Sequence, residues 1–199
     1  MLTRFPDMPV RRHPSALEGW GSDRYVCQAK LDGWRVFVTS GPVVATRHGS
    51  EITHEVSPEL LVQVDQLLGH FPRGTILDGE WCKRRSRTLD LPERLYVWDV
   101  PRLGKTWQVR VPYTSRLEQV LFGFTKAFLW TVALGEPAPL VRLPDQDTGD
   151  FPAFYEAQAK DPYSEGVVVK ARSSGLVLNH RRCAKNPRWF KVLEEVPSA

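Results

Sequence analysis

The chain has 199 residues, of which 42% are hydrophobic and 25% charged, an ordinary composition for a globular protein with one core. Its three cysteines form no CxxC pair, so the sequence indicates neither a disulfide framework nor a zinc site. The N-terminus lacks the apolar core of a signal peptide, and no apolar run is long enough to span a bilayer. We therefore expect a cytoplasmic protein, with a bacterial or phage context as one option.

The net charge of +4 is modest, but the positive charges are unevenly distributed. Seven Lys or Arg and no acid lie between Lys170 and Lys191, and a second basic cluster occupies Lys83 to Arg87. Two basic runs favour a polyanionic partner. Nucleic acid suits them better than a membrane, because neither run lies on a convincing amphipathic helix.

In the first half of the chain, residues 1–22 contain Pro and Arg and are expected to be irregular. Segments rich in Val, Tyr, Phe and Trp predict strands at 24–31, 34–40, 42–47, 74–83 and 94–100. Asp32-Gly33, between the first two strands, is typical of a β-hairpin turn. Ser57-Pro58 predicts a helix start, followed by an apolar face of Leu60, Leu61, Val64, Leu67 and Leu68.

In the second half, Ser115 to Glu118 has the form of a capping box that opens a helix. A further helix is predicted at 150–160, and strands at 127–132, 140–143, 166–170 and 188–193. Helices and strands are mixed without a βαβ rhythm. This order favours an α+β fold with mostly antiparallel sheets flanked by helices.

The segment KLDGWR, residues 30–35, contains residues that a turn alone does not require. A hairpin alone would need Asp32 and Gly33 and would leave Lys30 and Arg35 as solvated strand residues. However, KLDGWR is similar to K-x-D-G-x-R, the nucleophile motif of the covalent nucleotidyltransferases: ATP-dependent DNA ligases, RNA ligases and mRNA capping enzymes. Further segments resemble the other motifs of that superfamily in order: TRHGS (46–50), LDGEW (77–81), YVWDV (96–100), PYTSR (112–116), SEGVVVK (164–170) and RWFKV (188–192).

The resemblance runs from Tyr25 to Val192 and implies a nucleotidyltransferase fold of the ATP-grasp-like, ligase adenylation type. It implies that Lys30 attacks the α-phosphorus of ATP, expels pyrophosphate and holds AMP as a phosphoramidate. By the same resemblance, Lys170 and Lys191 contact the α-phosphate. Positive charges beside Lys30 favour its neutral, nucleophilic amine and stabilise charge on the phosphate oxygens.

The same resemblance implies two roles for the acidic residues of the motifs. Glu80 would bind the ribose or a metal ion, and Glu165 would hold Mg²⁺, with Mn²⁺ as an alternative, because carboxylate oxygens suit a hard cation. Asp32 would support the nucleophile loop, and Gly33 belongs to the same nucleotide-binding segment. Trp98 would stack on the purine, although a core tryptophan on a strand is an equally good interpretation.

Three arginines are candidates for phosphate or ribose contacts, because a guanidinium matches paired oxygens: Arg35, Arg47 and Arg116. Arg47 is assigned to the 5′-phosphate of the polynucleotide or to the AMP phosphate by resemblance to ligases. Lys185 is a weaker candidate of the same kind. Two positions depart from the ligase pattern: Gln28, in the nucleotide-binding set, replaces the usual acid, and Leu193 replaces the second Lys of W-x-K-x-K.

DNA ligases and capping enzymes continue into an OB-fold domain, whereas eight residues follow Lys191 here. We therefore expect a single nucleotidyltransferase domain over residues 1–199, without a C-terminal OB-fold domain, acting as a monomer. A repair or replication partner could replace the missing clamp.

The sequence thus predicts an ATP-dependent polynucleotide ligase that seals nicks through a lysyl-AMP intermediate. Nicked duplex DNA is the first expected substrate, and a nick in an RNA/DNA duplex is the second. An RNA ligase and a capping-type guanylyltransferase remain alternatives within the superfamily. A module that binds nucleic acid without catalysis is the alternative from another class.

Overall fold

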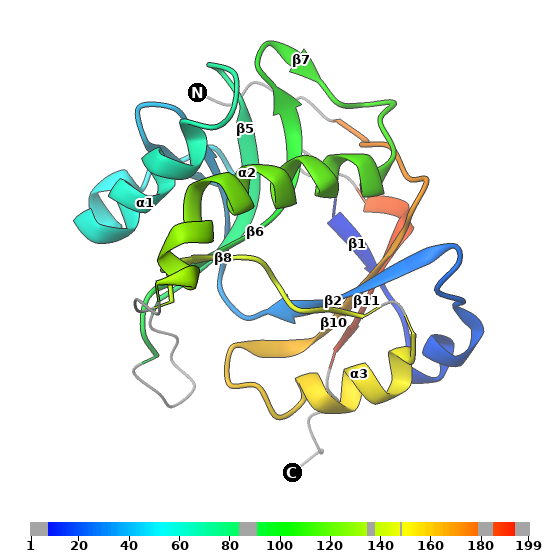
Figure 1. Ribbon diagram of the computed structural model, residues 1–199. Helices are drawn as coiled ribbons and strands as arrows, with labels where there is room; N and C mark the ends of the chain where they lie inside the picture. The colour runs from blue at the N-terminus through cyan, green and yellow to red at the C-terminus, as the bar shows by residue number, and fades with distance from the viewer. Residues whose placement is uncertain (1–7, 84–90, 135–137, 148, 179–184, 194–199) are drawn as a thin grey trace.

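The computed structural model describes residues 8–83, 91–134, 138–147, 149–178 and 185–193. Two β-sheets form the body of the protein, and helices flank them (Figure 1). Most strand pairs are antiparallel. The predicted α+β class with mostly antiparallel sheets is therefore confirmed. None of the described helices is both long enough and apolar enough to cross a membrane.

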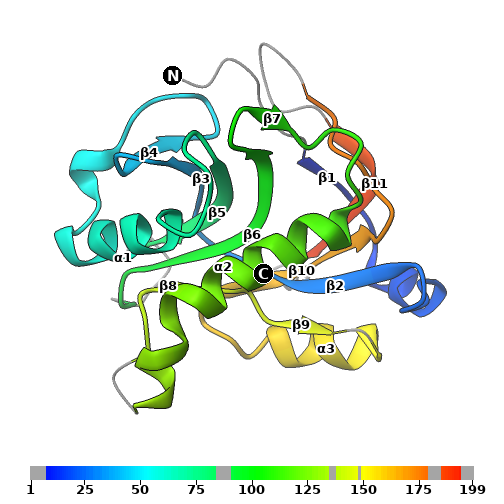
Figure 2. The same cartoon turned by 45° about the horizontal axis from the view of Figure 1, so that its top comes forward.

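The first sheet has five strands in the order β1-β11-β10-β2-β9, and only its β1–β11 pair is parallel. Helix α3, Phe151–Gln158, and the short 3-10 helix η1, Pro14–Gly19, pack against it through a small apolar cluster (Figure 2). The strands are β1 Met8–Arg11, β2 Tyr25–Leu31, β9 Gln146–Asp147, β10 Ser164–Ala171 and β11 Lys185–Leu193.

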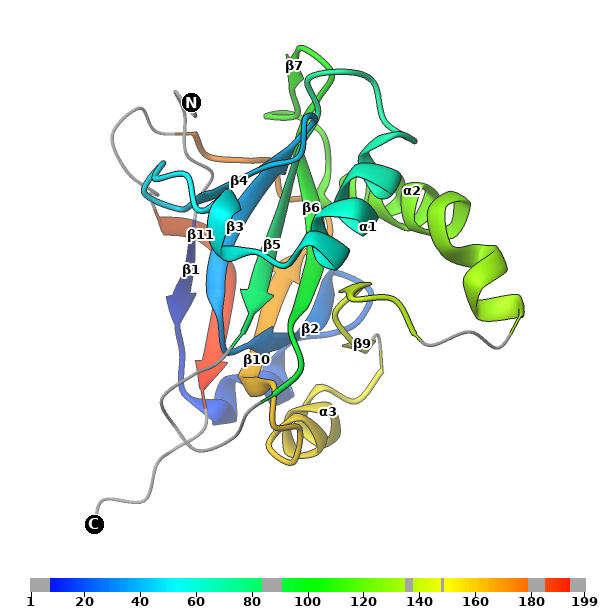
Figure 3. The same ribbon diagram turned by 90° about the vertical axis from the view of Figure 1, so that its left-hand side faces the viewer.

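The second sheet has the order β4-β3-β5-β6-β7, and β8 pairs with β6 in parallel. Figure 3 shows α1 and α2 side by side along this sheet. A short 3-10 helix, η2, spans Thr53–Glu55. The strands are β3 Trp34–Thr39, β4 Val43–Thr46, β5 Ile76–Cys82, β6 Arg94–Leu103, β7 Thr106–Trp107 and β8 Val141–Arg142, and the helices are α1 Pro58–Leu68 and α2 Tyr113–Ala133.

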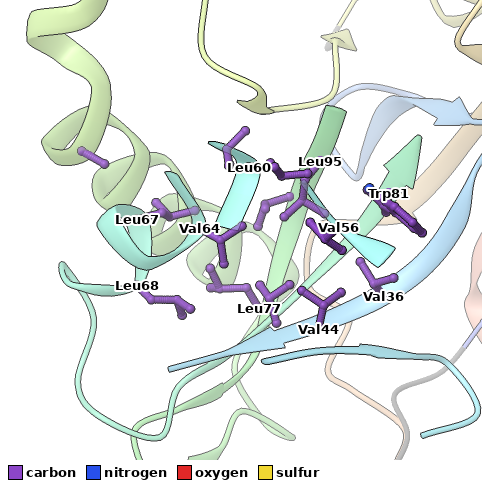
Figure 4. Packing of buried hydrophobic residues seen from close by; sticks show 14 of the residues in the cluster. Val36, Val44, Val56, Leu60, Val64, Leu67, Leu68, Leu77, Trp81 and Leu95 are labelled. Carbon is purple, nitrogen blue, oxygen red and sulfur yellow. The ribbon is translucent and has the colours of Figure 1, made fainter. Parts of the chain in front are cut away.

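The largest apolar core lies between the two long helices and the second sheet. Ser57 caps α1 as predicted, because its side chain accepts a hydrogen bond from the Leu60 amide at 3.3 Å. The predicted apolar face of α1 is buried toward β5 and β6, as Figure 4 shows for Leu60, Val64, Leu67, Leu68, Leu77 and Leu95.

Three sequence-based element predictions were wrong. Helix α2 continues to Ala133, so residues 127–132 are helical, because Val120, Ala127 and Phe128 extend one buried helical face. Ser115 lies inside this helix, so it is not the predicted cap. The N-terminal segment contains β1 and η1 instead of irregular chain.

The predicted hairpin at Asp32-Gly33 is also wrong, because β2 and β3 belong to different sheets. The chain crosses between the sheets here, and the Asp32 amide donates to the Tyr163 carbonyl at 2.8 Å. Gly33 is not among the glycines with positive φ. A Cβ at Gly33 would lie 2.5 Å from the Trp81 carbonyl oxygen, so glycine is needed for close approach to β5.

A buried ion pair attaches α2 to β6. The Arg116 side chain and the Asp99 side chain are both 0% exposed, and Arg116 Nε and Nη2 donate to the two Asp99 oxygens at 2.8 and 3.0 Å. Arg116 Nη1 also donates to the carbonyl of Ser174 at 3.1 Å. The charged groups of Arg116 and Asp99 therefore bind partners inside the protein.

We predict that Arg116→Met lowers the free energy of unfolding by about 3–5 kcal/mol, because it leaves the Asp99 carboxylate buried without its counter-charge. Urea unfolding of the purified proteins measures this change. The double variant Asp99→Asn/Arg116→Met should lose less than the sum of the two single variants. Glu118→Gln, an exposed change on the same helix, is the control and should have little effect. A loss with Arg116→Met no larger than with this control would contradict the prediction.

Candidate active site

A pocket of about 920 Å³ opens between the two sheets, within the size range of small-molecule sites. The first sheet lines it with residues of β1, β2, β10 and β11, and the second with residues of β3, β5 and β6 and of the segment after β4. Eleven of the thirteen predicted site residues line it: Gln28, Lys30, Gly33, Arg35, Arg47, Glu80, Trp98, Glu165, Lys170, Lys185 and Lys191.

Lys30 lies near the end of β2, and its side chain is 19% exposed. Its Nζ donates a hydrogen bond to Glu165 Oε1 and forms an ion pair with that carboxylate. The β10–β2 register shifts between Ser164 and Val167, and this irregularity contains Glu165. Such bulges re-aim side chains, and here the result is a carboxylate directed at the lysine amine.

Glu80, on β5, faces the same pocket from the second sheet. One of its carboxylate oxygens accepts a hydrogen bond from the Gly33 amide at 3.2 Å. Burial raises the pKa of Glu80 to about 7, against the lowering effect of the Lys30 and Arg35 charges. This acid is therefore poised to change its charge when a cation or a substrate enters the pocket.

The pocket fits a magnesium ion only if the substrate supplies part of its coordination. Among the described residues, no group of three or more His, Cys, Asp or Glu could hold a metal ion. Within the part of the chain that the structure describes, Glu80 and Glu165 are the two carboxylates lining the pocket. Mg²⁺ commonly binds through one or two carboxylates together with substrate phosphates, so these two residues suit an ion that arrives with a nucleotide.

Arg35 is held by a buried carboxylate beneath the pocket. Its Nε and Nη2 donate to the two oxygens of Asp78 at 2.9 and 2.6 Å, and the Asp78 side chain is 0% exposed. Burial raises the pKa of Asp78, while Arg35 opposes that shift. The paired contact fixes the direction of the guanidinium, which still lines the pocket.

Lys170 lies deeper, enclosed by aromatic rings. Its Nζ is 4.5 Å from the ring centre of Tyr113, 4.8 Å from that of Trp189 and 5.5 Å from that of Trp98. It also lies 3.4 Å from the Tyr113 hydroxyl oxygen. Burial lowers the pKa of Lys170 to about 7, although Asp99 and other buried acids favour its charged form.

Two further predicted nucleotide contacts have distinct surroundings. Gln28 is 2% exposed, and its Nε2 has no hydrogen-bond partner among the residues that the structure describes. A buried donor without a partner is costly, so a ligand acceptor would stabilise this amide. Trp98 is half-buried and lines the pocket, and its stacking on a purine stays a prediction.

Two predicted residues lie elsewhere. Asp32 does not line the pocket and belongs to the crossing between the sheets. Arg116, predicted to contact a phosphate or ribose, does not line the pocket, and its guanidinium is buried against Asp99. Residues 84–87 of one basic run and residues 179–184 of the other fall outside the described residues.

Sequence reasoning missed several residues of the pocket. Met8, Pro9 and Arg11 reach it from β1, which pairs with a strand about 180 residues away in sequence, so no local pattern indicates their position. Trp34, 50% exposed, lies inside KLDGWR and could have been found from that motif. Trp189, 1% exposed, belongs to the final motif in the same way.

Comparison with known proteins identifies the fold. No protein-family model and no curated protein matches the sequence. Among solved structures, a mycobacterial DNA ligase D complexed with ATP and MES matches with a TM-score of 0.67 and 21% identity, over 95% of this chain and 60% of that one. The ligase domain of M. tuberculosis LigD matches with a TM-score of 0.65 and 22% identity, over 94% and 58%.

An archaeal ATP-dependent RNA ligase also matches, with a TM-score of 0.53 and 16% identity, over 94% of this chain and 48% of that one. The chain thus spans about three fifths, or less, of these ligase structures. Its fold is that of a nucleotidyltransferase-type ligase domain, which confirms the fold expected from the motifs.

We predict that the stability of the protein, relative to its Lys170→Met variant, rises between pH 7 and about pH 10. Below pH 7 the folded and unfolded chains both carry a protonated Lys170, so the cost of burying the charge is fully present. Above pH 7 the folded Lys170 loses its proton while the unfolded one keeps it up to about pH 10.4, so rising pH favours the folded state.

Urea unfolding of both proteins from pH 6 to pH 10 measures this difference. Lys126→Met, at an exposed lysine, is the matched control and should show no such slope. A free-energy difference between wild type and Lys170→Met that stays constant with pH would contradict the assignment.

Proposed function

We propose that this chain is the adenylation domain of an ATP-dependent polynucleotide ligase that seals nicks between a 3′-hydroxyl and a 5′-phosphate. The main supporting observation is Lys30, held by Glu165 in a pocket that the described residues line with seven Lys or Arg side chains and two carboxylates. Such an excess of positive charge favours an anionic ligand, and the lysine amine is a nucleophile suited to attack on phosphorus.

In the first step, the Lys30 ammonium releases one proton to water, the resulting amine attacks the α-phosphorus of ATP, and the nitrogen releases a second proton to water as the phosphoramidate forms. A nitrogen–phosphorus bond forms, the bond from the α-phosphorus to the bridging oxygen breaks, and pyrophosphate leaves with the electron pair. Glu165 orients the amine through the hydrogen bond already present. Lys170 and Lys191 stabilise the negative charge on the α-phosphate oxygens.

Other pocket residues would position the nucleotide and its metal ion. Glu80 and Glu165 would hold Mg²⁺ or Mn²⁺, which supplies positive charge to the phosphate oxygens. Trp98 would stack on the purine, and the buried amide of Gln28 would hydrogen-bond a polar atom of the nucleotide. Arg35, fixed by Asp78, would contact the ribose or a phosphate.

In the second step AMP passes from Lys30 to the 5′-phosphate of a nicked strand, and in the third the 3′-hydroxyl displaces AMP and closes the nick. Arg47 and Lys185 are the proposed contacts to strand phosphates, which position the strand without reading its sequence. Duplex DNA is the proposed first substrate because TRHGS and LDGEW resemble DNA ligase segments. A nick in an RNA/DNA duplex is the second.

We expect the protein to retain label from α-labelled ATP and Mg²⁺ on a denaturing gel, because the phosphoramidate is covalent. Lys30→Ala should abolish the label, whereas Lys160→Ala, at an exposed lysine, should keep it. Label from GTP in place of ATP would assign a guanylyltransferase. The absence of label from both nucleotides, together with binding of nucleic acid, would indicate a non-catalytic binding module.

A substrate series then distinguishes DNA from RNA. The adenylylated protein is mixed with duplexes that carry one nick whose strands are DNA, RNA or one of each. Sealing should be fastest for the DNA nick. Faster sealing of RNA than of DNA would replace the DNA assignment by an RNA ligase.

A further inference from the structure

Strand β1 brings an arginine to the rim of the pocket, beside a lysine of the proposed adenylation site. In the parallel β1–β11 pair, Arg11 is opposite Lys191 and Met8 is opposite Lys185. The Arg12 amide donates to the Lys191 carbonyl at 2.9 Å, which fixes this end of β1. All four register partners, Met8, Arg11, Lys185 and Lys191, line the pocket.

The charges at this rim are mostly positive. Burial is the main cause that lowers the pKa of Lys191, and the positive charges of Lys30, Arg11 and Arg47 lower it further, while Glu165 opposes them. Among the described residues, no carboxylate lies within ion-pair distance of Arg11, Lys185 or Lys191. An anion between Arg11 and Lys191 would relieve the repulsion between these two side chains.

Three of the other pocket cations already have defined surroundings. Lys30 is bound to Glu165, Arg35 is bound to Asp78, and Lys170 is enclosed by aromatic rings. Arg11, Lys185 and Lys191 differ from them, because among the described residues no carboxylate pairs with these three cations, and Lys191 lies near the nucleophile Lys30.

We propose that Arg11, with Lys191, forms a subsite for the β- and γ-phosphates of ATP and binds the departing pyrophosphate. This inference rests on the proposed adenylation of Lys30. Neighbouring strands lie about 4.8 Å apart, so a guanidinium next to Lys191 reaches the phosphates beyond the one that Lys191 contacts. Arg11 stabilises the charge that appears on pyrophosphate as its bond to the α-phosphorus breaks.

The adjacent Arg12 provides a matched control. Its guanidinium lies 5.5 Å from the ring centre of Phe190, and it does not line the pocket. Arg11 is the last residue of β1 and lines the pocket, whereas Arg12 directly follows the strand and packs on Phe190. Arg11→Gln and Arg12→Gln remove the same charge from adjacent residues, so only the place of that charge differs.

The test uses labelled, adenylylated protein and measures its discharge to ATP by added pyrophosphate. Arg11→Gln should raise the pyrophosphate concentration for half-maximal discharge by about tenfold, whereas Arg12→Gln should leave it unchanged. Sealing of a nick already adenylylated at its 5′ end, which needs no pyrophosphate, should be unchanged in both variants. If Arg11→Gln slows only this sealing, the arginine binds the phosphate of the nucleic acid strand and the proposal is overturned.

Calorimetry of inorganic pyrophosphate with the unlabelled protein separates this inference from the proposed function. Pyrophosphate should bind to wild type and to Arg12→Gln with similar affinity, and about tenfold more weakly to Arg11→Gln. If wild type takes no label from ATP, the ligase proposal fails. The calorimetric affinities would still show whether Arg11 contributes to a pyrophosphate site. Equal affinity in all three proteins would overturn the inference.

Discussion

The side-chain nitrogen of Lys170 lies where water is almost absent, and much of the pocket floor is arranged around it. The residue is 4% exposed, and the rings of Tyr113 and Trp189 bring α2 and β11 against it. Buried Asp99 and Asp78 favour its charged form from the second sheet. Because no single strand or helix could surround a lysine in this way, the position of Lys170 depends on both sheets and on α2 being correctly packed.

Two arginines pair with Asp99 and Asp78 and so limit the negative potential that these acids produce in the pocket. Arg116 neutralises Asp99 from the side of α2, and Arg35 neutralises Asp78 from β3. Without these two pairs, the acids beneath the floor would offset the positive charge that attracts an anion. Arg116 thus contributes to the proposed site through the interior, even though it does not line the pocket, while Arg35 serves both places.

The ordered motifs predicted the fold and most of the pocket, because each motif ties a local strand to a chemical task, as LDGEW does for Glu80. The motifs could not predict which strands pair when these strands lie far apart in the sequence. Asp32-Gly33 has the chemistry of a hairpin turn, yet the choice between a hairpin and a crossing depends on contacts with β5 and Tyr163. Arg116 shows the same limit, since a guanidinium suits a carboxylate as well as a phosphate and only packing decides between them.

The cations around the pocket divide according to what holds them, and this division separates two tasks. Lys30 and Arg35 are bound by carboxylates, which fix the direction of an amine and a guanidinium before any substrate enters. The cations at the junction of β1 and β11 lie close to one another, and a bound phosphate would lower their mutual repulsion. Preorganised groups at the centre favour the geometry of attack. Cations at the rim repel one another, so a bound anion stabilises them more than it stabilises cations that already have a carboxylate partner. Such a pocket would hold its nucleophile in a fixed direction, while its outer cations would bind phosphate groups of the substrate and the leaving group.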